Sequence, residues 1–355
     1  MIAMKVLFVG ESWSGSSARS IREALIQLPG VRLDDIGEDH YFPKGRSMAM
    51  RLASRLLNRW HRLELARDVT ACIAATRPEV LMVYKGTGLT ADVVRFAKAE
   101  GVFTVNLYPD MSPHTHGKQL KDAMGIYDLV VSTKPFHPAA WESIYGYANP
   151  CVCVPHGYDP TVHYWAEPPV AQDVDVVLVG TCRPEYEQLM IELANELGDA
   201  AISVKIGGNG WDGSRSRLPA HWQISGPQVG RAYGEFVRRA RVVIAPVNSE
   251  VVVNGARQPG DEDSTRTYEL AAAGCFFLHR RTPYALRIYD ESTEVPMWDT
   301  AAELAALIRR FLPDEASRRE MAAKAHARAV PAYSIPGRAK AVLEHVQAAF
   351  RTRAQ

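Results

Sequence analysis

A short helix that carries one arginine and one glutamate is the part of this sequence best equipped for chemistry. Residues 261–274 read DEDSTRTYELAAAG, and the apolar run CFFLHR follows them. With Ser264 or Thr265 as the N-cap, Arg266 stands in the first turn, where the helix dipole disfavours a cation. The guanidinium therefore needs an anionic partner. That partner is either the acidic cluster 261–263 or a diphosphate bound jointly by the guanidinium and the helix amides.

Glu269 lies about one turn further into the same helix. Its two carboxylate oxygens can accept hydrogen bonds from the two hydroxyls of a ribose, as an acid does in dinucleotide-binding folds. Three alanines at 271–273 allow the helix to pack closely on a sheet, and Gly274 can adopt the left-handed conformation that ends a helix. The segment thus predicts a helix that binds a nucleotide.

Two turns elsewhere in the chain have the composition of phosphate-binding loops. Residues 10–20, GESWSGSSARS, place Gly15 and several serines before a helix whose N-terminal amides can receive an anion. Residues 176–189, VVLVGTCRPEYEQL, place Gly180 and Thr181 in a turn and Arg183 at the next helix start. Neither turn contains GxGxxG or a Walker lysine, which disfavours a dinucleotide-type fingerprint or a P-loop. A flexible loop and a surface arginine remain the alternatives.

The elements that must position these residues alternate between apolar runs and helical patterns. In the first part of the chain, strands are predicted at 5–10, 79–84, 102–108, 128–133 and 151–155, and helices at 16–28, 47–76, 90–100 and 135–146. Short apolar strands that alternate with helices indicate βαβ units and a parallel sheet. The proline-rich segment 156–173 then has the composition of an inter-domain linker.

A second series of the same kind follows the linker. Strands are predicted at 175–180, 201–208, 222–226, 241–246 and 275–280, and helices at 184–197, 228–239, 264–273, 300–312, 314–327 and 337–353. The chain is therefore expected to be an α/β protein with two Rossmann-like domains, 1–160 and 161–335, and a final helix at 336–355. Ligands of such sheets bind outside the carboxyl ends of the strands.

Composition limits the classes of protein that fit. The 355 residues are 47% hydrophobic and 23% charged, with a formal net charge of +1. This balance gives no general attraction for nucleic acid, so no nucleic-acid partner is expected. The apolar start of the chain is too short for a signal segment or a spanning helix, and the five cysteines lack zinc-like spacing. We expect a cytoplasmic protein with reduced cysteines.

Residues 175–350 resemble the C-terminal domain of GT-B glycosyltransferases, most closely the spore maturation protein-like (CgeB-like) group related to the retaining family 4. The resemblance rests on VLVGTCRPEYEQL, the glycine pair in VKIGGNGW, ISGPQ, RVVIAPVNSE and above all STRTYELAAAGCFFLHRRTP. It implies two Rossmann-like domains that face each other across a cleft, with the last helix crossing back to the first domain. The implied donor is a nucleotide-diphosphate sugar, and no cofactor is implied.

Donor-binding residues follow from this resemblance position by position. It implies that Glu269 binds the donor ribose and that Arg266 and Arg183 face the diphosphate. Family 4 enzymes carry two glutamates separated by seven residues, and this chain has an aspartate in the first position. Together with residues singled out by the loops and the helix start themselves, the full set of expected donor-binding residues is Gly15, Gly180, Thr181, Arg183, Lys205, Gly207, Asp261, Ser264, Thr265, Arg266 and Glu269.

Catalytic candidates come mainly from the first domain. Asp110 follows the strand VNLY, where family members often have an acid that faces the acceptor; it is a base for an inverting reaction, a sugar-positioning group for a retaining one, or a helix cap. His114 and His116 follow it in DMSPHTHG, and either contacts the sugar or has no function. The resemblance also implies that His156 and Gly157 lie at the cleft edge, and a packing role is the alternative for His156. Arg183, Arg266 and Lys205 would stabilise the leaving diphosphate.

The expected reaction is glycosyl transfer from a nucleotide sugar, retaining and without a divalent metal. The tripeptide 261–263 mimics an Asp-x-Asp metal motif, but metal binding needs more oxygen ligands than one tripeptide offers. The alternatives are a nucleotide-sugar epimerase or hydrolase of the same fold, and a binding protein with a closing cleft. The acceptor can be a small molecule, a glycan, a lipid-linked glycan or a protein.

One helix suggests a membrane contact. Between residues 47 and 67 arginines recur every four residues beside an apolar stripe, with Arg51, Arg55 and Arg59 in the first set and Met48, Leu52, Leu56 and Leu63 in the second. A basic amphipathic helix can bind an anionic membrane surface and would make the protein peripheral. The alternative is a solvated face above a packed stripe.

Overall fold

The chain is divided into two compact units. The computed structural model describes residues 3–42, 48–167, 170–253 and 255–353, and for residues 48–56 and 259 the backbone alone. Unit 1 comprises Met1–Pro155, Val251–Gln258 and Ile335–Gln355, and unit 2 comprises His156–Glu250 and Pro259–Ser334. The first division thus falls at Pro155, a few residues before the expected 160, because Tyr158 packs against Tyr268 and Ala272 of unit 2.

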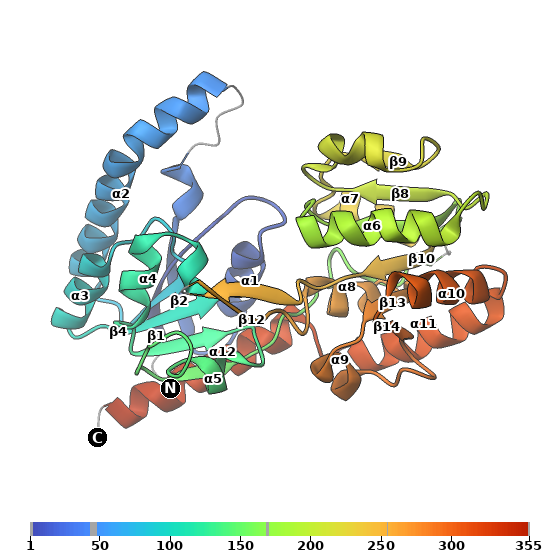
Figure 1. The fold of residues 1–355 in the computed structure, drawn as a ribbon. Coiled ribbons are helices and arrows are strands. Elements are labelled where there is room, and N and C mark those ends of the chain that lie inside the picture. Colours follow the sequence, from blue (N-terminus) through green and yellow to red (C-terminus); the bar gives the residue numbers. More distant parts are fainter. Residues whose placement is uncertain (1–2, 43–47, 168–169, 254, 354–355) are drawn as a thin grey trace. The chain divides into compact units, whose positions relative to one another are not determined.

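Unit 1 contains a parallel sheet with the order β2-β1-β3-β4-β5-β6 (Figure 1). Its strands are β1 (Met4–Gly10), β2 (Val31–Gly37), β3 (Val80–Tyr84), β4 (Phe103–Tyr108), β5 (Leu129–Ser132) and β6 (Cys151–Cys153). Its helices are α1 (Ser17–Ile26), η1 (Glu38–His40), α2 (Met48–Thr76), α3 (Ala91–Ala99), η2 (Pro113–Thr115), α4 (Lys118–Met124), α5 (His137–Ala140) and α12 (Ile335–Arg353). The chain adds β2 on one side of β1 and then adds β3 on the other side. The order of the strands therefore reverses between β1 and β3, and this pair is the topological switch point.

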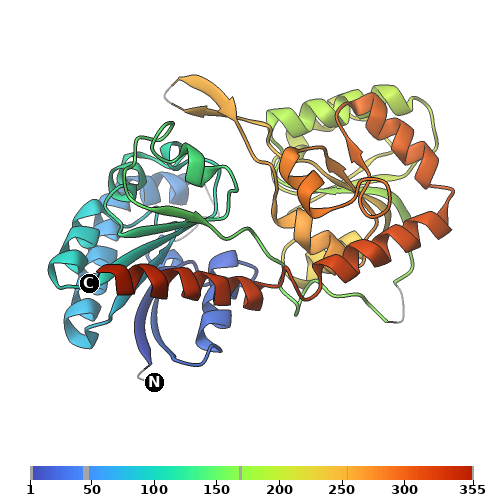
Figure 2. The same cartoon turned by 90° about the horizontal axis from the view of Figure 1, so that it is seen from below.

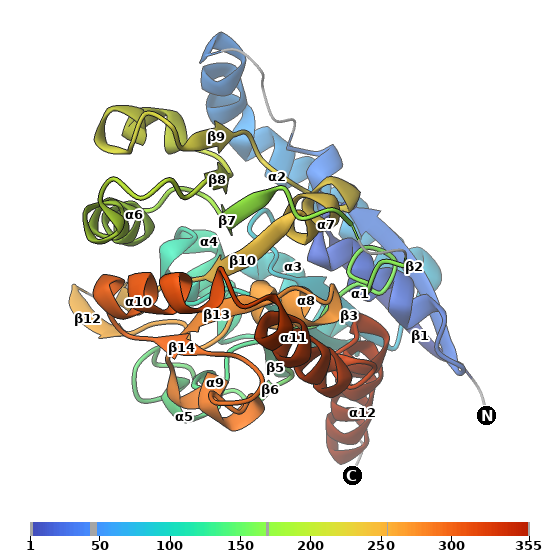
Figure 3. The same cartoon turned by 90° about the vertical axis from the view of Figure 1, so that its right-hand side faces the viewer.

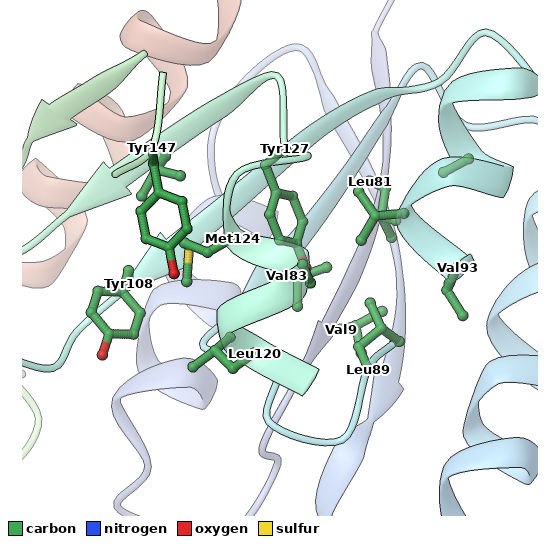
Figure 4. Close-up of a cluster of buried hydrophobic side chains, with 14 of the residues drawn as sticks. Val9, Leu81, Val83, Leu89, Val93, Tyr108, Leu120, Met124, Tyr127 and Tyr147 are labelled. Carbon is green, nitrogen blue, oxygen red and sulfur yellow. The ribbon is translucent and has the colours of Figure 1, made fainter. Parts of the chain in front are cut away.

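Helices cover both faces of this sheet because its strands are apolar on both. Leu81 and Val83 of β3 face the core formed with α2, α3 and α4 (Figure 4). Val80 and Met82 face the opposite core, formed with α1 and α12. The final helix therefore packs on the first sheet, and Figure 2 shows it lying across that face. This agrees with the GT-B arrangement.

Unit 2 repeats the design with the strand order β14-β13-β10-β7-β8-β9, again parallel. Its strands are β7 (Val174–Val179), β8 (Val204–Gly207), β9 (Gln223–Ser225), β10 (Ala240–Ala245), β13 (Phe277–Arg280) and β14 (Met297–Trp298). Its helices are α6 (Pro184–Leu197), η3 (Trp211–Arg217), α7 (Arg231–Arg238), α8 (Thr265–Ala272), α9 (Pro283–Ile288), α10 (Ala301–Phe311) and α11 (Glu315–Ala329). The switch point lies between β7 and β10.

The second sheet is also covered on both faces. Val176 and Leu178 of β7 pack against α6 and α10, whereas Val177 and Val179 pack against α7, α8 and α11. Figure 3 shows α6 and α10 on one side of the strands and α7 on the other. The helix of the DEDSTRTYEL segment, α8, is thus part of a fully packed layer, and its first turn lies at the carboxyl edge of the sheet.

Several elements differ from the sequence-based prediction. Strand β2 was not predicted, because it is an edge strand whose side chains alternate between partly buried and exposed. The two-stranded ribbon of β11 (Glu250–Val253) and β12 (Ala256–Pro259) was not predicted either. The helix predicted at 135–146 is reduced to the four residues of α5 followed by turns, because Trp141 and Tyr145 are drawn into the core.

Helix α2 has two different halves. Leu65, Val69 and Ile73 in its second half are buried in the core of unit 1. Before them Leu57, Trp60 and Leu63 are 46%, 68% and 54% exposed. The side chains of residues 48–56, and residue 47 itself, lie outside the described residues, so the predicted stripe is tested only at Leu63, which is not packed. Within the described residues, no helix combines the length and apolarity needed to cross a membrane.

Candidate active site

Arg266 lies at the topological switch point of unit 2. Its guanidinium donates to the carbonyl of Val179 at the end of β7 at 3.0 Å and to the carbonyl of Pro246 after β10 at 2.8 Å. A further hydrogen bond of 2.9 Å reaches the hydroxyl of Tyr186 in α6, over whose ring the guanidinium also lies. Two main-chain carbonyls and one hydroxyl thus accept hydrogen bonds from the terminal nitrogens of this first-turn cation. It ties α8 to β7 and β10 at the edge where ligands of such sheets bind.

Glycines allow two turns at this edge to approach each other closely. A Cβ on Gly208 would lie 2.0 Å from the carbonyl oxygen of Gly180, so only glycine fits there. The Gly180 N–H donates to the carbonyl of Gly207 at 2.9 Å, and the Trp211 indole donates to the carbonyl of Gly180 at 2.8 Å. These contacts bring Gly180 and Gly207 together and leave backbone, without side chains, next to α8.

Glu269 lies one turn after Arg266, with its side chain 17% exposed. Its Oε1 is 3.9 Å from Nε2 of His163. The Nδ1 of the same ring accepts the N–H of Asp159 at 3.1 Å, so a neutral His163 carries its proton on Nε2 and presents it to the carboxylate. Burial and then the charge of Glu269 raise the pKa of Tyr233, which therefore stays a phenol and a potential donor.

The residues before α8 form a rigid turn. Ser264 is the N-cap, with extended backbone, and Thr265 is the first helical residue. The buried Asp263 accepts a hydrogen bond of 2.6 Å from the Tyr268 hydroxyl, and the N–H of Asp261 donates to the Asn248 carbonyl at 2.6 Å. Within the described parts of the chain no three His, Cys, Asp or Glu side chains gather to hold a metal ion.

Three other predicted donor residues lie in different surroundings. Thr181 and Arg183 are exposed, and Arg183 is the N-cap of α6, directly after the Gly180 turn. Lys205 lies in the middle of β8, and its ammonium is 5.3 Å from the centroid of the Phe236 ring. Besides the hydrogen bond from Arg239, the Lys205 charge helps to lower the pKa of Asp173, which precedes β7. The same Phe236 ring lies next to Gly207, so the Lys205 ammonium is close to the glycine turn at the end of β8.

His156 and Gly157 begin unit 2 and are partly buried. The next residue, Tyr158, packs on Tyr268 of α8 and pairs through its N–H with the carbonyl of Tyr333. The segment is therefore attached to the same helix that carries Glu269.

In unit 1, Asp110 follows β4 and is part of a charged cluster. Its Oδ2 is 2.7 Å from Nζ of Lys85 and 3.1 Å from Nε2 of His116. Burial alone would raise the pKa of Asp110, but the hydrogen bond from His116 and the charge of Lys85 outweigh burial and lower it well below its usual range. Asp110 is therefore an ionised carboxylate at neutral pH. Lys85 has a left-handed backbone, with φ of 61°, which is strained for a residue with a side chain.

Buried side chains fix the loop that carries Asp110. His137 Nε2 is 3.0 Å from the carbonyl of Met111, and the Tyr145 hydroxyl donates to the same carbonyl at 3.0 Å. Burial lowers the pKa of His137 to about 4, so its ring is neutral and donates to that carbonyl through Nε2. The ring of His114 packs edge-on between Tyr145 and Tyr147. His114 thus stands among aromatic rings, and His116 is the histidine that contacts Asp110.

Gly15 lies in the exposed turn after β1, with φ of 96°, a conformation that favours glycine. The next residue, Ser16, is the N-cap of α1, and its hydroxyl accepts the N–H of Ala18 at 3.2 Å. Gly15 therefore provides the turn into α1, as the sequence suggests.

Sequence reasoning missed His163, Tyr233 and Lys85. His163 lies in the segment interpreted as a linker, and Tyr233 lies in α7, so neither has a local motif that marks it. Lys85 directly follows an apolar strand, and the same rule that selected Asp110, a charged residue at the carboxyl end of a parallel strand, would have found it.

Comparison with known proteins gives one match to a family model. Residues 183–344 match the model of a family described as glycosyl transferase-like. No curated protein sequence matches the chain.

Solved structures share the fold over nearly the whole chain. HepE of Anabaena, in complex with UDP and glucose, superimposes with a TM-score of 0.67 at 13% identity and covers 97% of this chain and 100% of its own. Sucrose-phosphate synthase of Thermosynechococcus elongatus gives 0.67 at 12% identity, with 98% and 100% covered. A Listeria monocytogenes protein provisionally assigned as a UDP-N-acetylglucosamine 2-epimerase gives 0.59 at 13%, with 99% and 97% covered.

The chain therefore has the GT-B glycosyltransferase fold, with two parallel six-stranded Rossmann-like sheets. Its segment 183–344, which contains the whole of α8, is glycosyl transferase-like in sequence.

Proposed function

We propose that the protein is a glycosyltransferase that moves a sugar from a nucleotide-diphosphate sugar to an acceptor. The observation that carries the proposal is the position of Glu269. It stands one turn inside a helix that starts at the switch point of unit 2, beside turns in which Gly180 and Gly208 expose backbone. In our proposal the Glu269 carboxylate accepts hydrogen bonds from the donor ribose, and His163 holds the carboxylate in place.

The diphosphate in this scheme binds at the turn that follows β7. The exposed Arg183 and the N–H groups of Thr181 and the start of α6 provide the positive end of a helix there. Arg266 supports this site indirectly, because its guanidinium fixes the carbonyls of Val179 and Pro246. As negative charge develops on the leaving diphosphate, these fixed donors stabilise it.

We propose that Asp110 of unit 1 acts on the acceptor or on the transferred sugar. Lys85 and His116 keep it ionised, which suits a group that accepts a proton or binds sugar hydroxyls. We further propose that the reaction retains the anomeric configuration and needs no divalent metal, and that the chain is related to the CgeB-like group and family 4. These proposals rest on the motif STRTYELAAAG.

UDP-sugars are the first donors to test, because a structural neighbour is seen with UDP and glucose. A single assay separates the proposed function from its alternative. Each UDP-sugar is incubated with the protein and a mixture of acceptors, and both transferred sugar and free sugar are measured. Free or epimerised sugar without transfer would instead support an epimerase or hydrolase. This is the second candidate function because the similar Listeria structure is provisionally assigned as an epimerase.

We also propose that α2 of unit 1 binds an anionic membrane surface, so that the acceptor can be lipid-linked. Leu57, Trp60 and Leu63 recur every third residue and are exposed, and Arg59 is exposed among them. Exposed aromatic and aliphatic side chains beside arginines on one helix are typical of interfacial helices. Under this proposal the protein is cytoplasmic and peripheral.

A further inference from the structure

Unit 2 contains a cavity with several arginines, at the edge of its sheet opposite the glycine turns. Its volume is about 570 Å³. It lies where β10 and β13 begin and α8 ends, and the first two turns of α11 form one wall. The proposed donor site uses the carboxyl ends of the same strands, so the cavity is separated from it by the length of the sheet.

Arginines dominate the lining of this cavity. Arg238 comes from α7, Arg241 from β10, and Arg318 and Arg319 from α11, whereas Glu315 is the only acidic residue among the described residues that line it. Two of the four have carboxylate partners at the rim, since Arg241 pairs with Asp175 at 2.8 Å and Arg319 pairs with Glu315 at 2.8 Å.

The other two arginines are buried and have no such partner. Arg238 is 9% exposed and Arg318 is 5% exposed, and within the described parts of the chain neither forms an ion pair. Arg238 donates to the carbonyl of Val162 at 3.3 Å, and Arg318 donates to the carbonyl of Phe311 at 2.5 Å. The Nε of each is buried without a hydrogen-bond partner among the described residues.

Buried charges in proteins are normally paired, and a buried N–H without an acceptor is costly. Burial, and then the nearby charge of Arg241, lower the pKa of Arg318. The cavity therefore has an excess of positive charge that its own side chains do not neutralise.

One wall of the cavity is aromatic. The ring of Trp165 lies so close to Gly274 that a Cβ there would be 2.6 Å from it, and Gly274 has the left-handed φ of 68°. Phe276, at the start of β13, adds a second apolar surface. Guanidinium groups beside flat apolar side chains suit an anion that carries a carbon skeleton.

We propose that this cavity binds a small organic phosphate, with its phosphate oxygens on Arg238, Arg241 and Arg318 and its carbon skeleton against Trp165. Planar guanidinium groups bind phosphate through paired hydrogen bonds, and this cavity presents several from different elements. The inference is independent of the proposed glycosyl transfer, since it uses none of the residues assigned to the donor.

Calorimetric titration of the full chain with inorganic pyrophosphate tests this site. The titration is run with and without saturating UDP, because pyrophosphate can also compete for a nucleotide diphosphate site. We expect salt-sensitive pyrophosphate binding that UDP does not displace, together with a fluorescence change that Trp165→Phe removes.

The double variant Arg241→Gln/Arg319→Gln removes two guanidinium groups whose pairs lie at the rim, so folding should survive. Its affinity for pyrophosphate should fall at least about tenfold, the scale of one charge-assisted contact. Arg328→Gln is the matched control, because Arg328 lies on the same helix and is also ion-paired, with Glu294. Pyrophosphate binding that UDP abolishes, or equal affinity in the double variant and the control, would overturn the proposal.

Discussion

Replacing Glu269 by glutamine gives the sharpest test of the donor site. Glutamine keeps the size of the side chain and one acceptor oxygen but removes the negative charge. If both carboxylate oxygens accept hydrogen bonds from a ribose diol, the loss of charge assistance weakens nucleotide binding by about 1.5 to 3 kcal/mol. That range corresponds to a Kd about 10 to 150 times higher.

The fold should tolerate this change. The imidazole of His163 lies 3.9 Å from the Glu269 carboxylate, and the terminal nitrogens of Arg266 donate to the carbonyls of Val179 and Pro246. Glu269→Gln removes one charge that acts on the buried Arg266 but leaves its main-chain acceptors in place, so the melting temperature should move by less than about 3 °C.

The assay compares UDP with its 2′-deoxy analogue by calorimetry in the wild type and in Glu269→Gln. The wild type should prefer UDP, and the variant should lose most of that preference, because only the carboxylate reads the 2′-hydroxyl. Glu262→Gln is a suitable control, since Glu262 lies in the turn before the same helix but is 3.9 Å from Arg287. An unchanged preference for UDP in Glu269→Gln would refute the assignment of the ribose to this residue.

Four further outcomes are expected. Asp110→Asn should lower turnover by about 100-fold or more while leaving UDP affinity unchanged, and an active variant would reduce Asp110 to a structural role. Because the pKa of Asp110 is lowered by folding, its carboxylate stabilises the protein above the unfolded pKa of about 4; the melting-temperature difference between wild type and Asp110→Asn should therefore shrink as pH falls below that value. Replacing Leu57, Trp60 and Leu63 by serine should weaken sedimentation with anionic liposomes, and equal sedimentation would return α2 to a solvated helix. Turnover should persist in excess chelator, and loss of activity with chelator would instead support a metal site at Asp261. NMR should show that the product has the same anomeric configuration as the donor.

The fold could be predicted largely because parallel strands are buried on both faces. Runs such as VLMVY and VVIA have no other stable location than a covered sheet, and the intervening helices follow from their periodicity. Strand β2 was not predicted because VRLDDIG is an edge strand with several polar residues, and β14 was not predicted because it is only two residues long. Helix α5 was overestimated, since tertiary packing of Trp141 and Tyr145 overrode the local pattern.

The candidate site could be predicted only where chemistry is local in sequence. Glu269 stands out by its place in a helix that follows a strand, and Asp110 by its place after β4. The contact of His163 with Glu269 spans more than one hundred residues, and no spacing rule encodes it. The partners of Arg266 are main-chain carbonyls, which every residue has, so the sequence could suggest a partner but not identify this one.

The ribbon of β11 and β12 has a consequence for dissecting the molecule. It interrupts unit 2 in sequence, yet Val251 and Val253 are buried in the core of unit 1. At the base of the ribbon, hydrogen bonds hold the entering and leaving segments next to each other. The N–H of Gly260 donates to the carbonyl of Ser249 at 2.8 Å, and the N–H of Asp261 donates to the carbonyl of Asn248 at 2.6 Å. If the chain were simply cut after Pro155, the ribbon would stay attached to the isolated unit 2, and Val251 and Val253 would lose the core that covers them. Excising 251–258, closing the gap with a short glycine linker and ending the chain at Ser334 should instead yield a unit 2 that folds on its own, on which nucleotide binding can be tested directly.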